Sequence, residues 1–248
     1  MNNIRHILQS VENVIHTQEE RSYFWTHEIR YRFILEHIKA IAKGKKLTIL
    51  DIGCFPYHIG KALELLGHEV YGISSYHEPI RQKNIAILNI EKDKFPYANN
   101  FFDMVLFNEV IEHLPQSPVV PLKEIHRVTK KDGYIMITTP NITRSINRAK
   151  LLLGKTIMFP IDVYFEEDGK GNNIYHRHNR EYTLYELKTL LTETSWKIEE
   201  KSYFISYTPF RKRTIPDPWF LFLGKLINYL LMCVAPSLRD TLFILGKK

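Results

Sequence analysis

A strand, a short helix and a second strand follow one another near the start of the chain, and this unit constrains the fold most. Apolar runs over 47–53 and 69–74 predict buried strands, and the apolar periodicity of 59–66 predicts a helix that ends at Gly67. Parallel strands need a crossover of this kind, and such crossovers are right-handed. The chain therefore begins its core as a βαβ unit.

The same alternation continues to the end of the sequence. Lys131–Gly133 is predicted as a turn, and Thr183 with Glu186 forms a predicted capping box at the start of a helix. Further strands are predicted over 86–89, 102–107, 134–139, 196–206 and 241–245, with a helix over 122–128. This pattern predicts an α/β fold with a doubly wound sheet and helices on both faces.

Three regions fall outside that alternation. Residues 1–43 show apolar residues at helical spacing and precede the first strand, so we predict an N-terminal helical extension over 1–44 and a core domain over 45–248. Residues 142–182 and 207–239 are predicted as insertions into the core. Insertions of this length are usually lids, substrate walls or interfaces.

Composition narrows the partners and the compartment. Cys54 and Cys233 have no metal-ligand spacing and the first residues are polar, so a reduced, cytoplasmic protein is expected. The formal net charge is +7, but most basic residues are scattered. Residues 108–111, after the fourth predicted strand, read Asn-Glu-Val-Ile rather than Asn-Pro-Pro-Tyr or Asp-Pro-Pro-Tyr, and no added RNA-binding module is recognisable. We therefore expect no nucleic-acid partner.

The loop after the first strand is the first place to expect a ligand, because open α/β sheets bind ligands beyond the carboxyl ends of their strands. Gly53 can adopt backbone angles closed to other residues and lets a ligand approach the main chain. Asp51 could accept a hydrogen bond from a cationic amine. On these residues alone, an ordinary turn remains an equal alternative.

Several segments, taken in order, resemble class I S-adenosylmethionine-dependent methyltransferases. The resemblance lies in Ile-Leu-Asp-Ile-Gly-Cys at 49–54, Phe-Pro-Tyr at 95–97, Phe-Phe-Asp-Met-Val at 101–105, Asn-Glu-Val-Ile-Glu-His-Leu at 108–114, the stretches 124–133 and 137–141, and His-Asn-Arg-Glu-Tyr-Thr at 178–183. It implies a Rossmann-like, mostly parallel sheet of seven strands with an antiparallel last strand. It also implies S-adenosylmethionine as cofactor. The implied cofactor-binding residues are Asp51, Gly53, Cys54, Phe55, Ser74, Ser75, Asn89, Ile90, Glu91, Asn108 and Glu109.

The chain departs from that family in its glycine loop and at the ribose position. Phe55 and Tyr57 stand where two further glycines are usual, and Ser74 and Ser75 stand where an acid usually ends the second strand. Hydroxyl groups make weaker hydrogen bonds than a carboxylate does. A non-catalytic, methyltransferase-like scaffold is therefore the alternative to an enzyme.

Histidines supply the predicted acceptor chemistry. His113 and His178 are predicted as general bases for a hydroxyl acceptor, with His176 as a further candidate. Glu109 and Glu112 precede His113 in a group similar to one that binds a divalent metal in some quinone-pathway methyltransferases, but we predict no metal. The acceptor is expected to be a small molecule. The Asp-Ile-Gly-Cys-Phe-Pro loop at 51–56 and the Arg-Glu-Tyr-Thr segment at 180–183 resemble those of methyltransferases of surface-glycan or other polysaccharide synthesis, which points to a hydroxyl of a sugar or of a lipid-linked glycan precursor.

The apolar segment 218–236 follows the basic triplet 211–213. One interpretation is an interfacial helix over 211–236 that contacts the inner face of a membrane. The other is a helix packed on the sheet or in a homodimer interface. Its place before the last strand, where a covering helix is expected, favours the second interpretation.

Overall fold

The protein is built on one seven-stranded sheet with the order β3-β2-β1-β4-β5-β7-β6. The computed structural model describes residues 2–75, 84–165, 167, 178–208 and 218–248. The strands are β1 Thr48–Ile52, β2 Glu69–Ser74, β3 Ile85–Ile87, β4 Phe102–Asn108, β5 Thr129–Pro140, β6 Lys197–Phe204 and β7 Thr241–Lys247. Only β7 runs antiparallel to its neighbours β5 and β6. The predicted Rossmann-like fold with an antiparallel last strand is confirmed.

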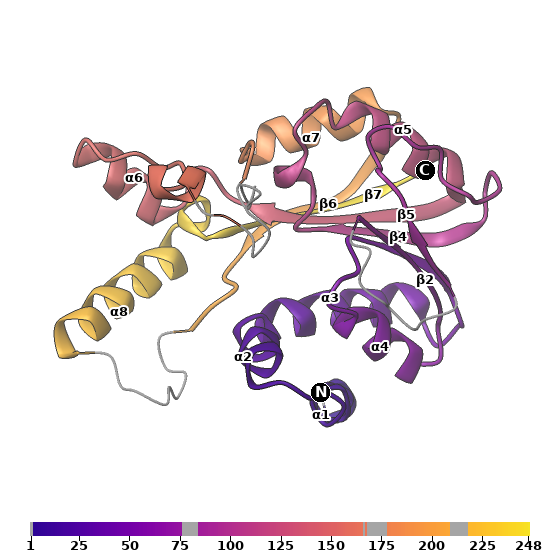
Figure 1. Cartoon of the computed structure of the whole chain (residues 1–248), viewed down its shortest axis with the longest axis horizontal. Coiled ribbons are helices and arrows are strands. Elements are labelled where there is room, and N and C mark those ends of the chain that lie inside the picture. The colour runs from indigo at the N-terminus through magenta and orange to yellow at the C-terminus, as the bar shows by residue number, and fades with distance from the viewer. Residues whose placement is uncertain (1, 76–83, 166, 168–177, 209–217) are drawn as a thin grey trace.

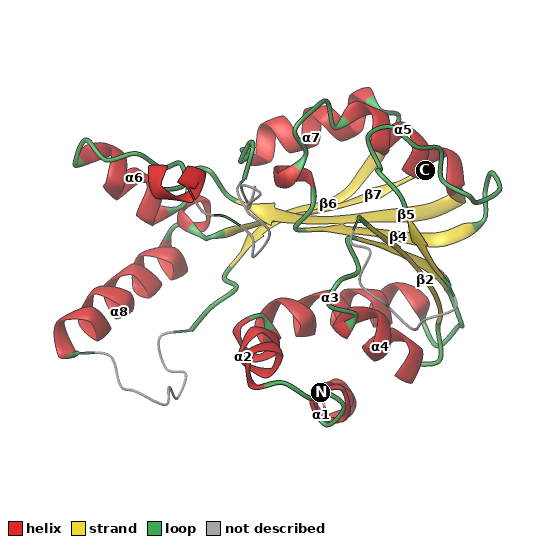
Figure 2. Ribbon diagram, viewed as in Figure 1, coloured by secondary structure: helices red, strands yellow, loops and turns green. Residues whose placement is uncertain are grey.

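Helices cover both faces of this sheet, and two more stand apart from it. The described helices are α1 Asn2–Glu12, α2 Gln18–Thr26, α3 Glu28–Ala42, α4 His58–Leu65, α5 Val119–Val128, α6 Ser145–Leu152, α7 Leu184–Glu193 and α8 Trp219–Val234, with short 3-10 turns η1 Ile111–His113, η2 Ile161–Phe165 and η3 Pro236–Leu238. Figures 1 and 2 show α1–α4 on one side of the sheet and α5 with α7 on the other. Both figures also show α6 and α8 standing away from the sheet, at the left.

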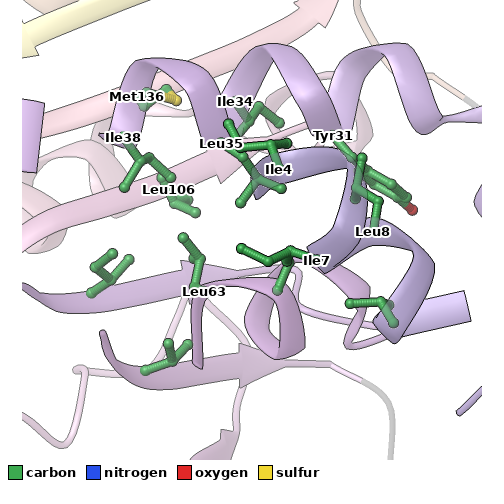
Figure 3. Packing of buried hydrophobic residues seen from close by; sticks show 14 of the residues in the cluster. Ile4, Ile7, Leu8, Tyr31, Ile34, Leu35, Ile38, Leu63, Leu106 and Met136 are labelled. Carbon is green, nitrogen blue, oxygen red and sulfur yellow. The ribbon is translucent and has the colours of Figure 1, made fainter. Parts of the chain in front are cut away.

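Successive side chains of a strand point to opposite faces of the sheet and pack in two separate hydrophobic cores. Ile49 of β1 belongs to the core beneath α1, α3 and α4, whereas the next residue, Leu50, belongs to the core beneath α5 and α7. This is the period of two that a strand buried on both faces requires. Figure 3 shows how Ile34 and Ile38 of α3 meet Leu106 of β4 in the first core.

Local signals in the sequence set two helix ends. Lys43 and Gly44 follow α3 with φ angles of 47° and 82°, so the chain leaves the helix in a left-handed conformation. Thr183 and Glu186 form the predicted capping box, with the Thr183 hydroxyl accepting a hydrogen bond from the Glu186 backbone N–H. Both predictions are confirmed.

Two strand boundaries differ from the prediction. The fifth strand begins at Thr129, and the predicted turn 131–133 is a bulge inside it, opposite a register shift between Phe102 and Met104. Asp132 has a φ of 63° in this bulge. The turn residues therefore bend the strand without ending it, because β5 pairs with β4 both before and after the bulge. The third strand covers 85–87, earlier than the predicted 86–89.

The expectation that residues 218–236 pack on the sheet is wrong. Of α8, only Met232 is buried, and the helix contacts α6 and η3 rather than a sheet face. The two strands beside the segment, β6 and β7, are covered by α7 on one face and by Phe33 and His37 of α3 on the other. The sheet therefore offers α8 no apolar face to bury. The basic triplet 211–213 lies outside the described residues.

Candidate functional site

The loop after β1 is shaped by Gly53. Its φ is 75°, and its N–H, like that of Cys54, donates to the backbone carbonyl of Ile73 at 2.9 and 3.2 Å respectively. A Cβ at Gly53 would lie 2.5 Å from Cγ2 of Val110, so no larger residue fits without a shift. Cys54 is buried with its sulfur against Gly72. Any cofactor contact from Cys54 would therefore come from its main chain.

Asp51 is the last residue but one of β1 and is the acid at this end of the sheet. Its carboxyl is buried, and burial raises its pKa to about 7. A buried acid with so high a pKa is strongly stabilised by a cationic partner, because a positive charge favours the ionised form. This is the property expected of a group that binds an amine.

The two aromatic residues of the loop have different environments. The Tyr57 ring packs on Gly60 of α4, where a Cβ would come within 2.2 Å of it, and its hydroxyl donates to Glu64 at 3.1 Å. Tyr57 is thus held along α4 as part of the first core. Phe55 is 47% exposed. The substitution of a family glycine by Tyr57 is accommodated by the helix.

The residues predicted to hold the ribose and adenine lie after β2 and β3. Ser74 is buried at the end of β2, and Ser75 beside it is exposed. The Asn89 side chain accepts from the backbone N–H of Glu91 at 2.9 Å, and Glu91 itself accepts from the N–H of Gln116 at 2.7 Å. Ile90, between them, is half-buried. These side chains organise their own loops. Glu78, an acid in the loop after β2 that could replace these serines at the ribose, lies outside the described residues.

Asn108 provides the test of whether a polar ligand fits. It ends β4 beside β1, two residues after Leu106, which pairs with Asp51. Both polar atoms of its side-chain amide are buried without a hydrogen-bond partner. Buried amides are nearly always paired in native proteins. An unpaired donor and acceptor next to Gly53 and Asp51 therefore fit a polar ligand such as the methionine part of S-adenosylmethionine.

Arg30 of α3 reaches this edge and was not predicted. Its guanidinium lies 2.8 Å from Oε2 of Glu109, whose Oε1 accepts from the Thr138 hydroxyl at 3.0 Å. Both carboxylate oxygens of Glu109 are therefore engaged, and Glu109 braces α3 against β4 and β5. The sequence did contain a sign of this role. Arg30 lies four and eight residues before Ile34 and Ile38, which are fully buried, so its side chain lies on the helix face that packs on the sheet.

A second group of titratable residues lies where β4 and β5 end. The Glu112 carboxyl is buried, and burial together with the charge of Glu109 raises its pKa. Its Oε2 accepts from Thr139 at 2.9 Å, and its Oε1 lies 3.9 Å from Nε2 of His113. The rings of His113 and His178 meet edge to face at 4.9 Å between centroids. The tertiary structure thus brings both predicted bases together.

Main-chain hydrogen bonds hold the second histidine there. The backbone carbonyl of Glu112 accepts from the N–H of Asn179 at 2.7 Å, and the Asn179 side chain donates to the carbonyl of His113 at 2.6 Å. The segment that carries His178 is therefore fixed on η1. His176, the other histidine considered, lies outside the described residues.

Glu181 orients His178 and is a residue that the sequence did not assign a role. His178 Nδ1 lies 3.0 Å from Oε1 of Glu181, and Arg144 donates to both oxygens of that carboxylate at 2.6 and 2.9 Å. Burial alone would raise the pKa of Glu181, but the hydrogen bonds from His178 and Arg144 outweigh burial and lower this pKa to about 2. Its signal in the sequence was the His-x-x-Glu spacing.

One metal ion could contact Glu112, His113 and His178 together, since one ligand atom from each lies within 4.8 Å of the others. Glu109, the third member of the group considered from the sequence, is held instead by Arg30 and Thr138. The absence of a metal stays a prediction.

Comparison with known families matches residues 18–201 to the methyltransferase domain. The chain belongs to the methyltransferase domain family. The match begins in α2 and ends in β6, so this methyltransferase carries in its family region both the loop after β1 and the histidine pair.

Two curated relatives are methyltransferases. A malonyl-[acyl-carrier protein] O-methyltransferase of Legionella pneumophila is 30% identical over 37% of this chain and 35% of its own length. An uncharacterized methyltransferase of Schizosaccharomyces pombe is 30% identical over 44% of each chain. These matches span less than half the length of either relative.

Solved structures show the same fold. The crystal structure of an S-adenosylmethionine-dependent methyltransferase from Archaeoglobus fulgidus has a TM-score of 0.57 at 15% identity and covers 92% of this chain and 99% of its own. A 1,6-didemethyltoxoflavin N1-methyltransferase from Burkholderia thailandensis, solved with S-adenosylhomocysteine, has a TM-score of 0.53 at 17% identity, over 90% of this chain and 80% of its own. S-adenosylmethionine, the cofactor predicted from the sequence, is the cofactor that this family and fold indicate.

Proposed function

We propose that this methyltransferase transfers the methyl group of S-adenosylmethionine to a hydroxyl group of a small molecule. The observation that carries the proposal is the fixed pair of His178 and Glu181 beside His113, where β4 and β5 end. A hydroxyl is a weak nucleophile until a base removes its proton, and histidine is suited to that step near neutral pH. An imidazole held by a carboxylate is a recurrent form of such a base.

Two neighbouring groups of residues at the carboxyl ends of the strands would bind the cofactor and remove the proton of the acceptor. Asp51, Asn108 and the Gly53 main chain would hold the cofactor, whose sulfonium supplies an electrophilic methyl group when it is bound. Glu181 accepts the Nδ1–H of His178 and so leaves Nε2 to take the proton. Nε2 of His178 would take the hydroxyl proton as the acceptor oxygen bonds to the methyl carbon, while the sulfur–methyl bond breaks and S-adenosylhomocysteine is left as the second product. Arg144 keeps Glu181 ionised, which stabilises the imidazolium that results.

A sugar or glycan-precursor hydroxyl is the acceptor we propose within that class. Its support is the resemblance of the Asp-Ile-Gly-Cys-Phe-Pro loop and of the Arg-Glu-Tyr-Thr segment at 180–183 to enzymes of surface-glycan synthesis. The alternative of a non-catalytic scaffold is disfavoured by two observations. Tyr57 packs on α4, and the buried Asn108 amide is unpaired beside Gly53.

The test combines binding and transfer. Calorimetry with S-adenosylhomocysteine should give a saturable signal, and methyl-labelled S-adenosylmethionine should pass its label to hydroxyl compounds as a methyl ether. Absence of heat and of a thermal shift at millimolar ligand would leave the scaffold alternative. Label on an amine or a carboxylate, with His178→Ala at full turnover, would contradict the hydroxyl acceptor and its base.

A further inference from the structure

Helix α8 turns Met232 and the polar Asn228 inward and leaves most of its large apolar side chains exposed. The Asn228 side chain accepts from the Ser145 hydroxyl and donates to the Tyr207 hydroxyl. The exposed residues of the helix include Trp219, Phe220, Leu223, Ile227, Leu230, Leu231 and Val234. This is the reverse of a helix that packs on a core and faces water.

The apolar exposure continues on α6 and the segment after it. Leu152 is 88% exposed, and its neighbours Leu151 and Leu153 are exposed as well. Met158, Ile161 and Phe165 follow with more than half of each side chain exposed. Figure 1 shows α6 and α8 forming a projection beyond the end of the sheet. We call α6, residues 153–165 and α8 the apolar projection. So much contiguous exposed apolar surface marks an interaction site.

Charge on the apolar projection identifies the kind of partner. Helix α8 carries one charged residue, Lys225, and no acid. On α6 and residues 153–165, Arg148, Lys150 and Lys155 stand against one acid, Asp162, and Glu167 is exposed just beyond them. Two copies of this surface would bring like charges together, whereas anionic lipid headgroups would neutralise them.

The length of α8 fixes its orientation. It has 16 residues, about 24 Å of helix, and no described helix is both long and apolar enough to cross a bilayer. A short helix with one wholly apolar face lies in the plane of the interface. We propose that the apolar projection docks this methyltransferase on an anionic lipid surface.

The apolar projection is joined directly to the acceptor site. Arg144, which holds Glu181, is the residue before α6, and Asn147 of α6 donates to the same carboxylate at 3.2 Å. A hollow with mostly apolar walls lies between them, lined by Ile142, Ile157, Met158, Phe159, His178 and Glu181. Together with the proposed function, on which this step rests, the arrangement suits an amphiphilic acceptor presented at the membrane.

Vesicle flotation of the full chain tests the docking without any methyl transfer. Wild-type protein should bind vesicles of phosphatidylcholine with phosphatidylglycerol more tightly than vesicles of phosphatidylcholine alone. The double variant Ile227→Glu with Leu230→Glu should lower binding roughly a hundredfold. Val120→Glu on α5, where Val120 is 48% exposed, is the matched control and should leave binding unchanged. Lys150→Gln with Lys155→Gln should weaken binding to the anionic vesicles alone, by about fivefold per lysine.

Several outcomes would overturn the docking. They are wild-type protein that binds neither vesicle, a Glu double variant that binds as wild type, or light scattering that shows a dimer split by the double variant without vesicle binding. Thermal melting and S-adenosylhomocysteine binding confirm that each variant is folded. A chain that binds vesicles but transfers no methyl group would contradict the proposed function and leave the docking intact.

Discussion

The two helical additions to the core are both rich in apolar residues, yet they bury them in opposite ways. In the N-terminal extension, Ile34, Leu35 and Ile38 of α3 have no more than 1% of their side chains exposed. In α8, Ile227 and Leu230 are 50% and 55% exposed. The extension and α4 together cover one face of the sheet, whereas both faces of β6 and β7 are covered by α7 and α3, which leaves none for α8. Apolar content therefore shows that a helix needs a partner, but the packing of the other elements decides whether the chain supplies one.

The additions also serve different halves of the site. The extension places Arg30 on Glu109, next to the predicted cofactor residues, and links Tyr31, His58 and Glu20 in one hydrogen-bonded chain. The insertion over 142–182 places His178 and Glu181 at the acceptor side. We therefore expect variants of the extension to change stability and cofactor binding, and variants of the insertions to change acceptor chemistry.

His178→Ala should have the largest effect, and this effect should fall on methyl transfer and not on cofactor binding. Removal of a general base slows a proton-transfer-dependent step by roughly a hundredfold to ten-thousandfold. Turnover with a hydroxyl acceptor should fall by that factor, while calorimetry should show unchanged affinity for S-adenosylhomocysteine. His113→Ala, the paired variant, should have a smaller effect, because the Glu112 carboxylate lies 3.9 Å from Nε2 of His113, whereas the Glu181 carboxylate lies 3.0 Å from Nδ1 of His178. Full turnover in both variants would show that the base lies elsewhere.

A matched pair of isoleucines tests the contrast in burial. Ile38→Ala removes a fully buried side chain and should lower the free energy of unfolding by about 2–5 kcal/mol. Ile227→Ala on α8 should change it by less than about 0.5 kcal/mol. Urea unfolding of the two variants measures both. Equal losses would mean that a partner already covers α8 in solution.

Asp51→Asn should weaken S-adenosylhomocysteine binding about tenfold to a hundredfold, since a hydrogen bond to a charged group contributes about 1.5–3 kcal/mol. The effect should depend on pH. Burial raises the pKa of Asp51 to about 7, so the wild-type affinity should rise as pH increases from 6 to 8 and the affinity of the variant should not. Calorimetry across that range gives both results, and a wild-type affinity that is flat with pH would contradict the role of Asp51.

The same substitution should have the opposite effect on stability. A carboxyl whose folded pKa is raised contributes stability at low pH that is lost as pH rises through about 7. Asparagine stays neutral throughout. Asp51→Asn without ligand should therefore melt at a higher temperature than wild type at pH 8, and this difference should shrink toward pH 5. Thermal melting at the two pH values is the control for the binding experiment.

The smallest expected effect is that of Arg30→Gln. Its ion pair with Glu109 is partly buried, with 12% and 22% of the two side chains exposed. Loss of Arg30 leaves Glu109 uncompensated next to Glu112, and we expect a loss of about 1–2 kcal/mol in the free energy of unfolding. Lys155→Gln, at an exposed position of the insertion, is the control and should cause no measurable loss. A Glu109→Gln change in the Arg30→Gln background should recover part of the stability.

The sequence by itself determined the sheet. Apolar runs of strand length, the Gly53 turn and the Thr183 capping box depend on neighbours a few residues apart, and such local patterns can be recognised in one dimension. The resemblance to methyltransferases followed from segments in a fixed order. The bulge at 131–133 was predicted as a turn between elements. Turn residues look the same in a sequence whether or not the chain resumes pairing with the same neighbouring strand after them.

Only the tertiary structure decided how the loop from Asp51 to Gly60 accommodates Tyr57, and which distant residues complete the site. The pairs Arg30 with Glu109 and His178 with His113 join residues 79 and 65 positions apart, at distances that no spacing rule predicts. The exposure of α8 was decided in the same way. A helix buries its apolar face only where an uncovered surface remains, and that depends on how all the other elements pack.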